Sequence, residues 1–185
     1  MMTIPAFRSP LVQYAFAYAD AAHRLVGQRR KYTGEPYINH PAQVVALLRQ
    51  VPHTVEMLAA AWLHDTVEDT QVTLQDIELR FGAKIAALVE QLTDVSCPGS
   101  GNRAARKAID LAHIALASPE AKTIKLADLI DNTATIVEHD PNFAKVYLEE
   151  KARLLEVLVE GDQTLLARAW AQLHKAKEKL DLCSC

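Results

Sequence analysis

Apolar residues recur three or four positions apart along almost the whole chain, which is the spacing of one face of an α-helix. Runs that alternate between apolar and polar residues and contain β-branched side chains, the pattern typical of half-buried strands, are missing. Half of the 185 residues are apolar, and a chain of this length can bury one sizeable core. We therefore predict an all-α protein whose residues 1–185 form a single domain.

Proline, glycine and capping residues divide this pattern into segments. Helices are expected from Ser9 or Pro10 to Arg29, over 39–49, 54–69, 73–81, 83–92, 103–117 and 162–180, and after Pro119 and Pro141. Asn39 is expected to cap its helix, and Thr73 to begin a capping-type start. Segment 96–102 is the loosest loop and the candidate for a lid. The apolar stripe of the last helix is expected to pack in the core, and it comprises Leu165, Leu166, Ala169, Trp170, Leu173, Ala176 and Leu180.

The charges nearly balance, with 20 Lys and Arg against 23 Asp and Glu, so the chain has no general attraction for a nucleic-acid backbone. No run of about 18 apolar residues is present to span a bilayer, and Met1–Pro5 lacks the features of a secretory signal. We expect a soluble, cytoplasmic protein without nucleic-acid or membrane partners. Cys97, Cys183 and Cys185 do not form a disulfide framework, and the last two are expected to lie in a reduced tail.

The pair His64–Asp65 follows an apolar stretch, Ala59–Leu63, that favours a helix. Buried histidine and aspartate side chains need partners, because unpaired polar or charged groups are costly away from water. A divalent cation would satisfy both. Glu68 and Asp69 follow one turn later and face the same side if the helix persists that far. The alternative for His64 is a hydrogen-bonded core histidine without a metal.

Two other segments offer ligands of the same kind. His40 stands at a helix start, and Asp128 lies inside an otherwise apolar helical stretch. With His64 and Asp65 they make a set of two nitrogen and two oxygen ligands, which suits Mn²⁺, Fe²⁺ or Zn²⁺ and leaves coordination positions open. Such a site indicates hydrolysis. Taken singly, a histidine such as His40 is more often a surface or capping residue, and an aspartate such as Asp128 is more often an exposed or lysine-paired acid.

A hydrolytic site also needs a carboxylate that prepares the water and cations that receive a phosphate-bearing substrate. Glu68 and Asp69 are placed for the first role, and their alternative is to be solvated acids beyond a helix end. Arg29–Lys31 closes the first helix and offers the nearest cations. Basic residues at this end of a helix also complement its dipole without any further role.

Further polar residues follow the lid candidate and Asp128. A second basic face on the helix over 103–117 contains Arg103, Arg106 and Lys107, which are alternatively surface charges. Asn132 and Thr135 lie one and two turns beyond Asp128. They are candidate contacts to a sugar or base, or ordinary polar residues of a helix.

Several short motifs occur in a fixed order, and together they are specific. They are Gln28–Lys31, Gly34–Pro41, Leu63–Thr70, Phe81–Gly82, Ala121–Lys122 and Lys125–Asp128. In this combination the chain resembles the HD-type hydrolase domain of RelA/SpoT proteins, as a stand-alone small alarmone hydrolase. The resemblance implies an all-α HD-domain bundle of eight to ten helices without a synthetase domain. It also implies hydrolysis of (p)ppGpp to GDP or GTP and pyrophosphate.

The resemblance also assigns roles to residues. It places metal ligands at His40, His64, Asp65 and Asp128 and water-activating acids at Glu68 and Asp69, the same six residues that the spacing indicates. It implies one Mn²⁺ ion, with Fe²⁺ and Zn²⁺ less favoured, and a small pyrophosphorylated nucleotide as the partner. Nucleotide contacts fall on Arg30, Lys31, Asn132, Thr135 and Tyr147.

The chain departs from the usual pattern of these hydrolases at two places. After Asp128 the usual Lys-Leu-Tyr-Asn is replaced by Leu129–Asn132, which puts the acid Asp131 in place of an aromatic residue, and Phe143 stands where an arginine is common. These changes leave the six predicted metal and water-activating residues intact. They make an adenine alarmone such as (p)ppApp an alternative substrate.

The alternative functions are an HD phosphohydrolase of another nucleotide and a catalytically inactive alarmone-binding sensor.

Overall fold

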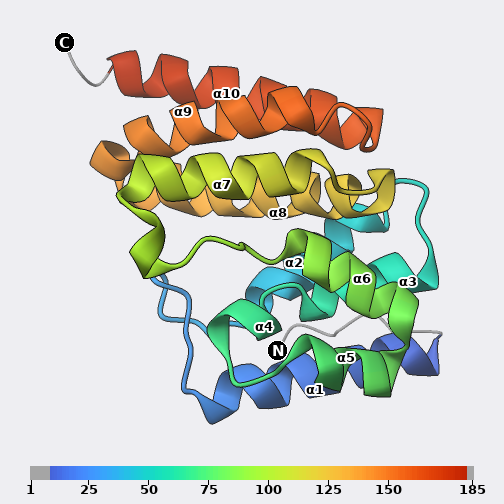
Figure 1. Ribbon diagram of the computed structural model, residues 1–185. Helices are drawn as coiled ribbons and strands as arrows, with labels where there is room; N and C mark the ends of the chain where they lie inside the picture. Colours follow the sequence, from blue (N-terminus) through green and yellow to red (C-terminus); the bar gives the residue numbers. More distant parts are fainter. Residues whose placement is uncertain (1–8, 183–185) are drawn as a thin grey trace.

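The computed structural model describes residues 9–182, with side chains through residue 180, and this part of the chain contains helices and loops but no strand (Figure 1). The helices are α1 (Pro10–Leu25), α2 (Asn39–Leu48), α3 (Val55–Leu63), α4 (Thr66–Asp69), α5 (Leu74–Phe81), α6 (Ala83–Leu92), α7 (Arg103–Ala115), α8 (Pro119–His139), α9 (Pro141–Val157) and α10 (Gln163–Leu182), with a 3-10 turn η1 at Pro98–Ser100. The all-α prediction is confirmed.

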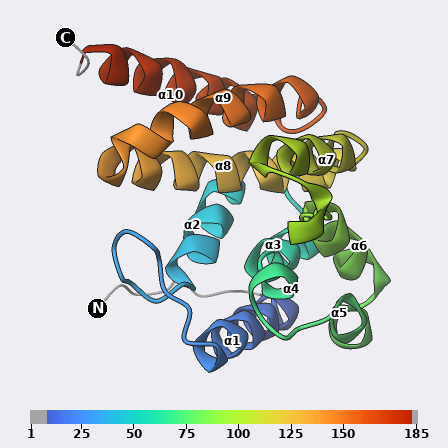
Figure 2. The ribbon, with the colours of Figure 1, turned by 60° about the vertical axis from the view of Figure 1, so that its left-hand side comes forward.

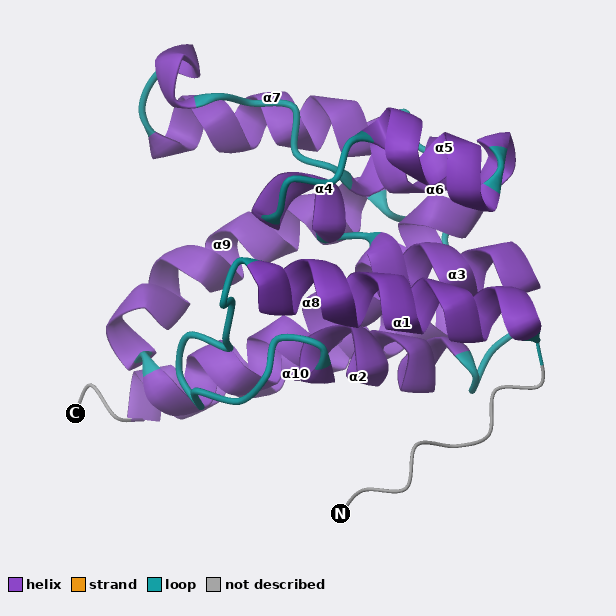
Figure 3. Ribbon diagram, turned by 90° about the horizontal axis from the view of Figure 1, so that it is seen from below, coloured by secondary structure: helices purple, strands orange, loops and turns teal. Residues whose placement is uncertain are grey.

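The helices form two groups that are connected by α2 (Figures 1 and 2). In the first group α8 packs against α9 and α10, and α7 lies against α9. In the second group α3 contacts both α1 and α6, and α5 packs on α6. Seen from below, α1 lies in front of α3 (Figure 3). Because α2 contacts both α3 and α8, it lies where the two groups meet.

Helix α3 is buried along most of its length. Every residue from Met57 to Leu63 is buried, and the ring of Trp62 packs edge-on against Phe16 of α1 with 4.9 Å between centroids. Helix α8 contributes a second buried surface, which includes Ile124, Leu126, Ala127, Leu129 and Ile130. Side chains at the end of α3 and in the middle of α8 are therefore held by a closely packed core.

The last helix packs as its spacing predicts. Its buried residues are Leu165, Leu166, Ala169, Leu173, Ala176 and Leu180, and Trp170 is half-buried. A polar contact lies beside this stripe, where Lys151 of α9 is buried and donates to Thr133 Oγ1 at 2.7 Å and Gln172 Oε1 at 2.9 Å. Burial lowers the pKa of Lys151 to about 7. These bonds connect α9 with both α8 and α10.

Several predicted helix boundaries are confirmed. Thr73 and Asp76 form the capping box that begins α5, because each side chain accepts a hydrogen bond from the backbone N–H of the other residue. Gly82 ends that helix with a positive φ of 88°. Pro119 and Pro141 are the first residues of α8 and α9.

Two boundaries near the first loop were predicted wrongly. Helix α1 ends at Leu25 rather than Arg29, because Gly27 adopts a positive φ of 67° and turns the chain. Asn39 is the first residue of α2 rather than its cap, since Ile38 holds the N-cap position without a side-chain hydrogen bond.

The helix expected over 54–69 is interrupted. Helix α3 ends at Leu63 and α4 begins at Thr66, so His64 and Asp65 lie at the break. The Thr66 hydroxyl donates to the Leu63 carbonyl oxygen at 2.7 Å. Such a local bond competes with the regular backbone pattern of a helix.

In the described part of the chain, no helix is long and apolar enough to cross a membrane. Cys97 is a free, exposed thiol. The predicted tail with Cys183 and Cys185, and the segment Met1–Pro5, lie outside the described residues.

Candidate functional site

The four predicted metal ligands come from segments that are distant in the sequence and close in space. His40 lies in the first turn of α2, His64 and Asp65 lie at the α3–α4 break, and Asp128 lies in the middle of α8. His40, His64 and Asp65 each offer a ligand atom, and these atoms all lie within 4.8 Å of one another. Asp128 Oδ1 is 3.1 Å from His40 Nε2 and 4.0 Å from His64 Nε2.

The hydrogen bond made by His64 determines which of its ring nitrogens is free. Nδ1 lies 2.9 Å from the carbonyl oxygen of Ala61, which can only accept, so Nδ1 carries the proton. Nε2 of the neutral ring then presents a lone pair. This atom is buried without a hydrogen-bond partner, although Asp65 Oδ2 is 3.1 Å away. A buried lone pair beside a carboxylate is costly unless a cation lies between them.

His40 is arranged in the same way by a side chain. Its Nδ1 lies 2.7 Å from Asp131 Oδ2, and its Nε2 faces Asp128 Oδ1. Burial lowers the pKa of His40, but hydrogen bonds to Asp128 and Asp131 and the charge of Asp65 outweigh burial and raise it to about 9. Without a metal, a proton on His40 therefore balances the carboxylates. A divalent cation can replace that proton.

The two carboxylates are held by their own donors. The Tyr37 hydroxyl donates to Asp65 Oδ2 at 2.6 Å, and Asn132 Nδ2 donates to Asp128 Oδ1 at 2.6 Å. Lys125 Nζ lies 2.9 Å from Asp128 Oδ2. Burial opposes ionisation of both acids, but the neighbouring imidazoles lower the pKa of Asp65, and Lys125 holds the pKa of Asp128 well below its usual range. Both groups are therefore present as carboxylates, the form that binds metals.

These residues fit a divalent metal ion. The donor set is two imidazole nitrogens and two carboxylate oxygens without thiolate, and one nitrogen is a buried lone pair with no other partner. Such a set leaves coordination positions for water and substrate.

A cavity of about 620 Å³ opens beside this donor set. Its lining includes Asp65, Glu68, Lys125, Asp128, Asn132 and Tyr147. Apolar side chains from α7 and α9, among them Leu111, Val146 and Leu154, form another part of the wall. The volume is in the range of small-molecule and cofactor sites, and the mixture of apolar walls and a few polar groups is typical of them.

Glu68 stands at the polar end of the cavity. Its Oε1 accepts a hydrogen bond from the backbone N–H of Asp94 at 2.6 Å. Partial removal from water raises the pKa of Glu68, and the carboxylate of Asp94 raises it further, to about 7. The side chain stays accessible from the cavity. A carboxyl group with this pKa can take a proton from water near neutral pH.

Asp69 lies apart from the cavity. Its Oδ2 accepts a hydrogen bond from Gln28 Nε2 at 2.8 Å, and Asp69 is not among the residues that line the cavity. The expectation that both acids face the same place rested on a continuous helix. Because the helix breaks at His64 and Asp65, the structure places Glu68 but not Asp69 beside the candidate ligands.

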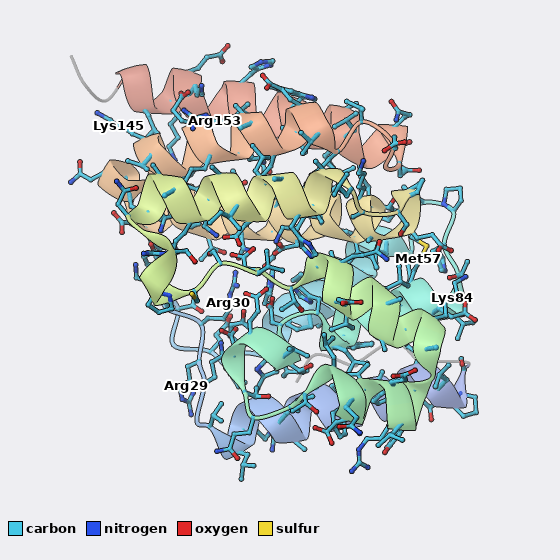
Figure 4. The ribbon with its side chains drawn as sticks, in the orientation of Figure 1. Arg29, Arg30, Met57, Lys84, Lys145 and Arg153 are labelled. Atoms are coloured by element: carbon cyan, nitrogen blue, oxygen red, sulfur yellow. The ribbon has the colours of Figure 1, made fainter. Side chains whose placement is uncertain are left out.

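Three of the predicted nucleotide contacts lie together on one side of α8. Arg30 Nη1 is 3.2 Å from Asn132 Oδ1, and Arg30 Nη2 is 3.1 Å from Thr135 Oγ1 and 3.0 Å from Asp131 Oδ2. The Arg30 side chain is only 12% exposed. Figure 4 shows Arg30 nearer the middle of the molecule than its neighbour Arg29. The guanidinium group of Arg30 therefore already forms hydrogen bonds with three side chains of α8.

The other two predicted nucleotide contacts, Lys31 and Tyr147, both lie near the ring of Phe143. Lys31 Nζ lies over the rings of Tyr32 and Phe143, at 4.8 and 5.6 Å from their centroids. Tyr147 lines the cavity, and its hydroxyl is 3.3 Å from Thr133 Oγ1. Of the five predicted nucleotide contacts, Asn132 and Tyr147 therefore line the cavity.

The second basic face is largely paired with acids. Arg103 forms a bidentate contact with Glu150, with N–O distances of 2.8 and 2.7 Å, and Lys107 Nζ lies 2.6 Å from Asp94 Oδ2. Arg103 and Lys107 both line the cavity. Their charges are therefore present at its wall but are partly neutralised.

The start of the lid candidate is attached to α7. Asp110 accepts hydrogen bonds from the backbone N–H groups of Val95 and Ser96 and from the Ser96 hydroxyl. The Asp110 side chain is buried. Ser96, the first residue of segment 96–102, is therefore held by α7, and the role of this segment as a lid stays a prediction.

Three residues at the site were not predicted to be functional: Tyr37, Lys125 and Asp131. Lys125 and Asp131 lie three positions before and after Asp128, which places them one helical turn from a predicted ligand. Polar residues at this spacing on an apolar helix were the signal that could have identified them. Tyr37 had no such signal, because its contact with Asp65 depends on how the loop before α2 folds back.

The fold and the site together define a class of protein. An all-α bundle holds two histidines and two aspartates beside a cavity of nucleotide size, as expected for a metal-dependent hydrolase of the HD class. The family described as HD domain matches residues 15–154. The chain belongs to the HD domain family.

Individual relatives narrow this class. The chain is 36% identical to the guanosine-3′,5′-bis(diphosphate) 3′-pyrophosphohydrolase MESH1 of Mus musculus, over 85% of this chain and 90% of the relative. It is also 36% identical to the Homo sapiens protein of the same name, over 86% and 90%. The Aquifex aeolicus guanosine-3′,5′-bis(diphosphate) 3′-pyrophosphohydrolase is 35% identical over 68% of this chain, which is 18% of that longer protein.

A solved structure agrees with these relatives. It is described as a metazoan ortholog of SpoT that hydrolyses ppGpp, and it matches with a TM-score of 0.79 and 28% identity. The match covers 94% of this chain and 97% of the other. Within the HD domain family, the chain therefore belongs with the 3′-pyrophosphohydrolases related to SpoT.

Proposed function

We propose that this protein is a metal-dependent 3′-pyrophosphohydrolase that converts (p)ppGpp to GDP or GTP and pyrophosphate. The observation that carries this proposal is the convergence of His40, His64, Asp65 and Asp128 beside a cavity of about 620 Å³, with the His64 Nε2 lone pair left unpartnered. The relationship to proteins named as guanosine-3′,5′-bis(diphosphate) 3′-pyrophosphohydrolases supports the choice of substrate.

In this proposal His40, His64, Asp65 and Asp128 hold one divalent ion, which we propose to be Mn²⁺ in preference to Fe²⁺ or Zn²⁺. When bound, the ion would polarise a phosphoryl oxygen and lower the pKa of a coordinated water. The structure supports the ligand set through the ionised carboxylates and the arrangement of the imidazole rings.

Glu68 is the proposed proton acceptor, because it lines the cavity and has a pKa of about 7. It would take a proton from the attacking water as the water oxygen bonds to phosphorus and the bond between phosphorus and the ribose 3′-oxygen breaks. The same proton would then pass to the 3′-oxygen, which leaves as a hydroxyl and restores the Glu68 carboxylate. Lys125 adds a positive charge at the same wall, where charge develops on the phosphoryl oxygens. The water-activating role of Asp69 stays a prediction from the sequence, because Gln28 holds its carboxylate outside the cavity.

Asn132 and Tyr147 are the proposed nucleotide contacts inside the cavity. Arg30, Lys31 and Thr135 do not line it, and their contacts with the nucleotide are proposed from the sequence. The partner in this proposal is a small pyrophosphorylated nucleotide and not a nucleic acid. A cytoplasmic location follows from the proposal, because a highly charged nucleotide does not cross a membrane unaided.

The test is a direct substrate assay. Mn²⁺-loaded protein is incubated with (p)ppGpp and separately with (p)ppApp, and the products are resolved by chromatography. We expect pyrophosphate together with the nucleoside di- or triphosphate. The (p)ppApp arm is included because Asp131 and Phe143 depart from the usual pattern of these hydrolases.

Two results would contradict the proposal. Release of orthophosphate would indicate an HD phosphohydrolase that acts on another nucleotide. Tight binding of the alarmone without turnover in Mn²⁺, Fe²⁺ and Zn²⁺ would indicate a catalytically inactive sensor.

A further inference from the structure

Asp131 stands out in the sequence only as an acid at an unusual position, but its side chain lies directly behind a candidate metal ligand. Asp131 Oδ2 is 2.7 Å from His40 Nδ1. The same oxygen is 3.0 Å from Arg30 Nη2. One carboxylate oxygen therefore accepts hydrogen bonds from an imidazole ring and from a guanidinium group.

We propose that Asp131 is a positioning residue for the metal, because it holds the His40 ring so that Nε2 faces the candidate metal centre. The inference rests on the proposed function, since it requires a metal at this place. An ionised carboxylate accepts hydrogen bonds but donates none, so the Nδ1 atom carries the ring proton. In the neutral ring the lone pair is then on Nε2, which lies beside Asp128 Oδ1 and Asp65 Oδ2.

The two candidate histidine ligands differ in what orients them. His64 follows α3, and the Ala61 carbonyl oxygen of that helix accepts its Nδ1 proton. His40 is in the first turn of α2, and the carbonyl oxygen at the same spacing, that of Tyr37, accepts the His40 backbone N–H at 2.9 Å. Its partner comes instead from α8, where Asp131 lies one turn beyond Asp128. Helix α8 thus supplies one ligand and the group that orients another.

Arg30 fixes Asp131 from a second direction. The side chains of Arg30 and Asp131 are 12% and 17% exposed, so their ion pair is largely shielded from water. Arg30 is itself held by Asn132 and Thr135, which lie on the same side of α8. The carboxylate is therefore constrained by two donors, as expected for a group that must keep a metal ligand in one orientation.

The first test measures Mn²⁺ affinity by isothermal titration calorimetry. Asp131→Leu removes the acceptor, and we expect it to weaken Mn²⁺ binding by about 10- to 100-fold. Asp131→Asn should weaken binding less, because the amide oxygen can still accept the His40 proton. The matched control is Thr135→Val, which removes another partner of Arg30 but leaves the His40–Asp131 bond, and we expect it to bind Mn²⁺ with wild-type affinity.

The second test observes the His40 ring directly. In Zn²⁺-loaded protein with ¹⁵N-labelled histidine, the His40 Nδ1 proton should give a slowly exchanging downfield NMR signal, assigned by its absence from His40→Asn. Asp131→Leu should lose this signal and keep that of His64, whose Nδ1 proton is held by Ala61. A residue that only supported the fold would change neither signal selectively.

The outcomes separate the inference from the proposed function. Wild-type Mn²⁺ affinity in a folded Asp131→Leu protein would overturn the inference. If Asp131→Leu does not fold, as judged by circular dichroism, Asp131→Asn decides, and unchanged affinity with an unchanged His40 signal would overturn the inference. Failure of the wild-type protein to bind Mn²⁺ would instead overturn the metal site of the proposed function.

Discussion

Each candidate ligand of the metal centre is held by another group of the protein, and in both histidines the held atom is Nδ1, which leaves Nε2 facing the centre. His64 is held through Ala61 and His40 through Asp131, while Tyr37 holds Asp65. These contacts leave two imidazole nitrogens near carboxylate oxygens, with separations of 3.1 to 4.0 Å between the pairs. The carboxylates favour a positive charge at this centre. Either a proton or a metal ion can supply that charge, so protons and metal ions should compete for the site.

Metal binding should release a proton from His40. The pKa of His40 without metal is about 9, so at pH 7 the ring is protonated, whereas a metal ligand must be neutral. Apparent Mn²⁺ affinity should therefore rise as the pH increases toward about 9 and become less dependent on pH above it. Calorimetry at pH 7 in two buffers with different ionisation enthalpies measures the number of protons released. Equal binding enthalpies in both buffers would show that no proton leaves.

Glu68→Gln should separate metal binding from turnover. The substitution keeps the shape of the side chain but removes the proposed proton acceptor, so we expect the rate to fall by about 10²- to 10⁴-fold with metal content unchanged. Asp65→Ala should lose metal and activity together, since Asp65 is a proposed ligand. Steady-state kinetics and metal analysis of the purified proteins test both, with Glu178→Gln on the exposed surface of α10 as the control. Full activity of Glu68→Gln would refute the role assigned to it.

The break between α3 and α4 is the element that most affects how the site is built. It places His64 and Asp65 outside regular helix, and it separates Glu68 at the cavity from Asp69 beside Gln28. No glycine or proline lies between Leu63 and Thr70, so the usual signals for a helix end were missing. The Thr66 hydroxyl on the Leu63 carbonyl and the Tyr37 hydroxyl on Asp65 are contacts that only the folded chain provides.

Helix spacing was more predictable than helix packing. The capping box at Thr73, the proline starts of α8 and α9 and the buried stripe of α10 depend on residues close in sequence, and these predictions are confirmed. The spacing also put Asp128, Asn132 and Thr135 on one side of α8. That Arg30 would bind this side depends on how the first loop folds across residues about 100 positions away, which local patterns do not encode.

The turn between α9 and α10 has little room for a side chain at Gly161, so a substitution there should destabilise the fold. A Cβ there would lie 2.8 Å from Leu126 Cδ1 and 3.2 Å from the backbone carbon of Lys122, both on α8. Because backbone cannot move aside as a flexible side chain can, we expect Gly161→Ala to lower the free energy of unfolding by about 1–3 kcal/mol. Gly99→Ala is the control, since its nearest neighbour is 3.9 Å away. Urea unfolding followed by circular dichroism measures both, and equal midpoints would contradict the predicted crowding.

The candidate metal centre connects the two groups of helices. Its residues come from α2, from the segment after α3 and from α8, so a bound ion would join α8 to the group that contains α1, α3, α5 and α6. In the unfolded chain these residues are far apart, as His40 and Asp128 are separated by 88 positions (128 − 40). A ligand that binds the folded chain much better than the unfolded chain stabilises the whole fold.

Mn²⁺ should therefore raise the melting temperature of the entire domain. At a free concentration 100 times Kd, the ion adds about 2.7 kcal/mol to the free energy of unfolding, which for a domain of this size corresponds to roughly 5–10 °C. Differential scanning calorimetry should show this shift in one transition, its reversal by a chelator and its loss in Asp65→Ala. If wild-type protein that demonstrably binds Mn²⁺ melted at the same temperature with and without it, the ion would have to bind the unfolded chain equally well, and a site assembled from three separate segments could not be where it binds.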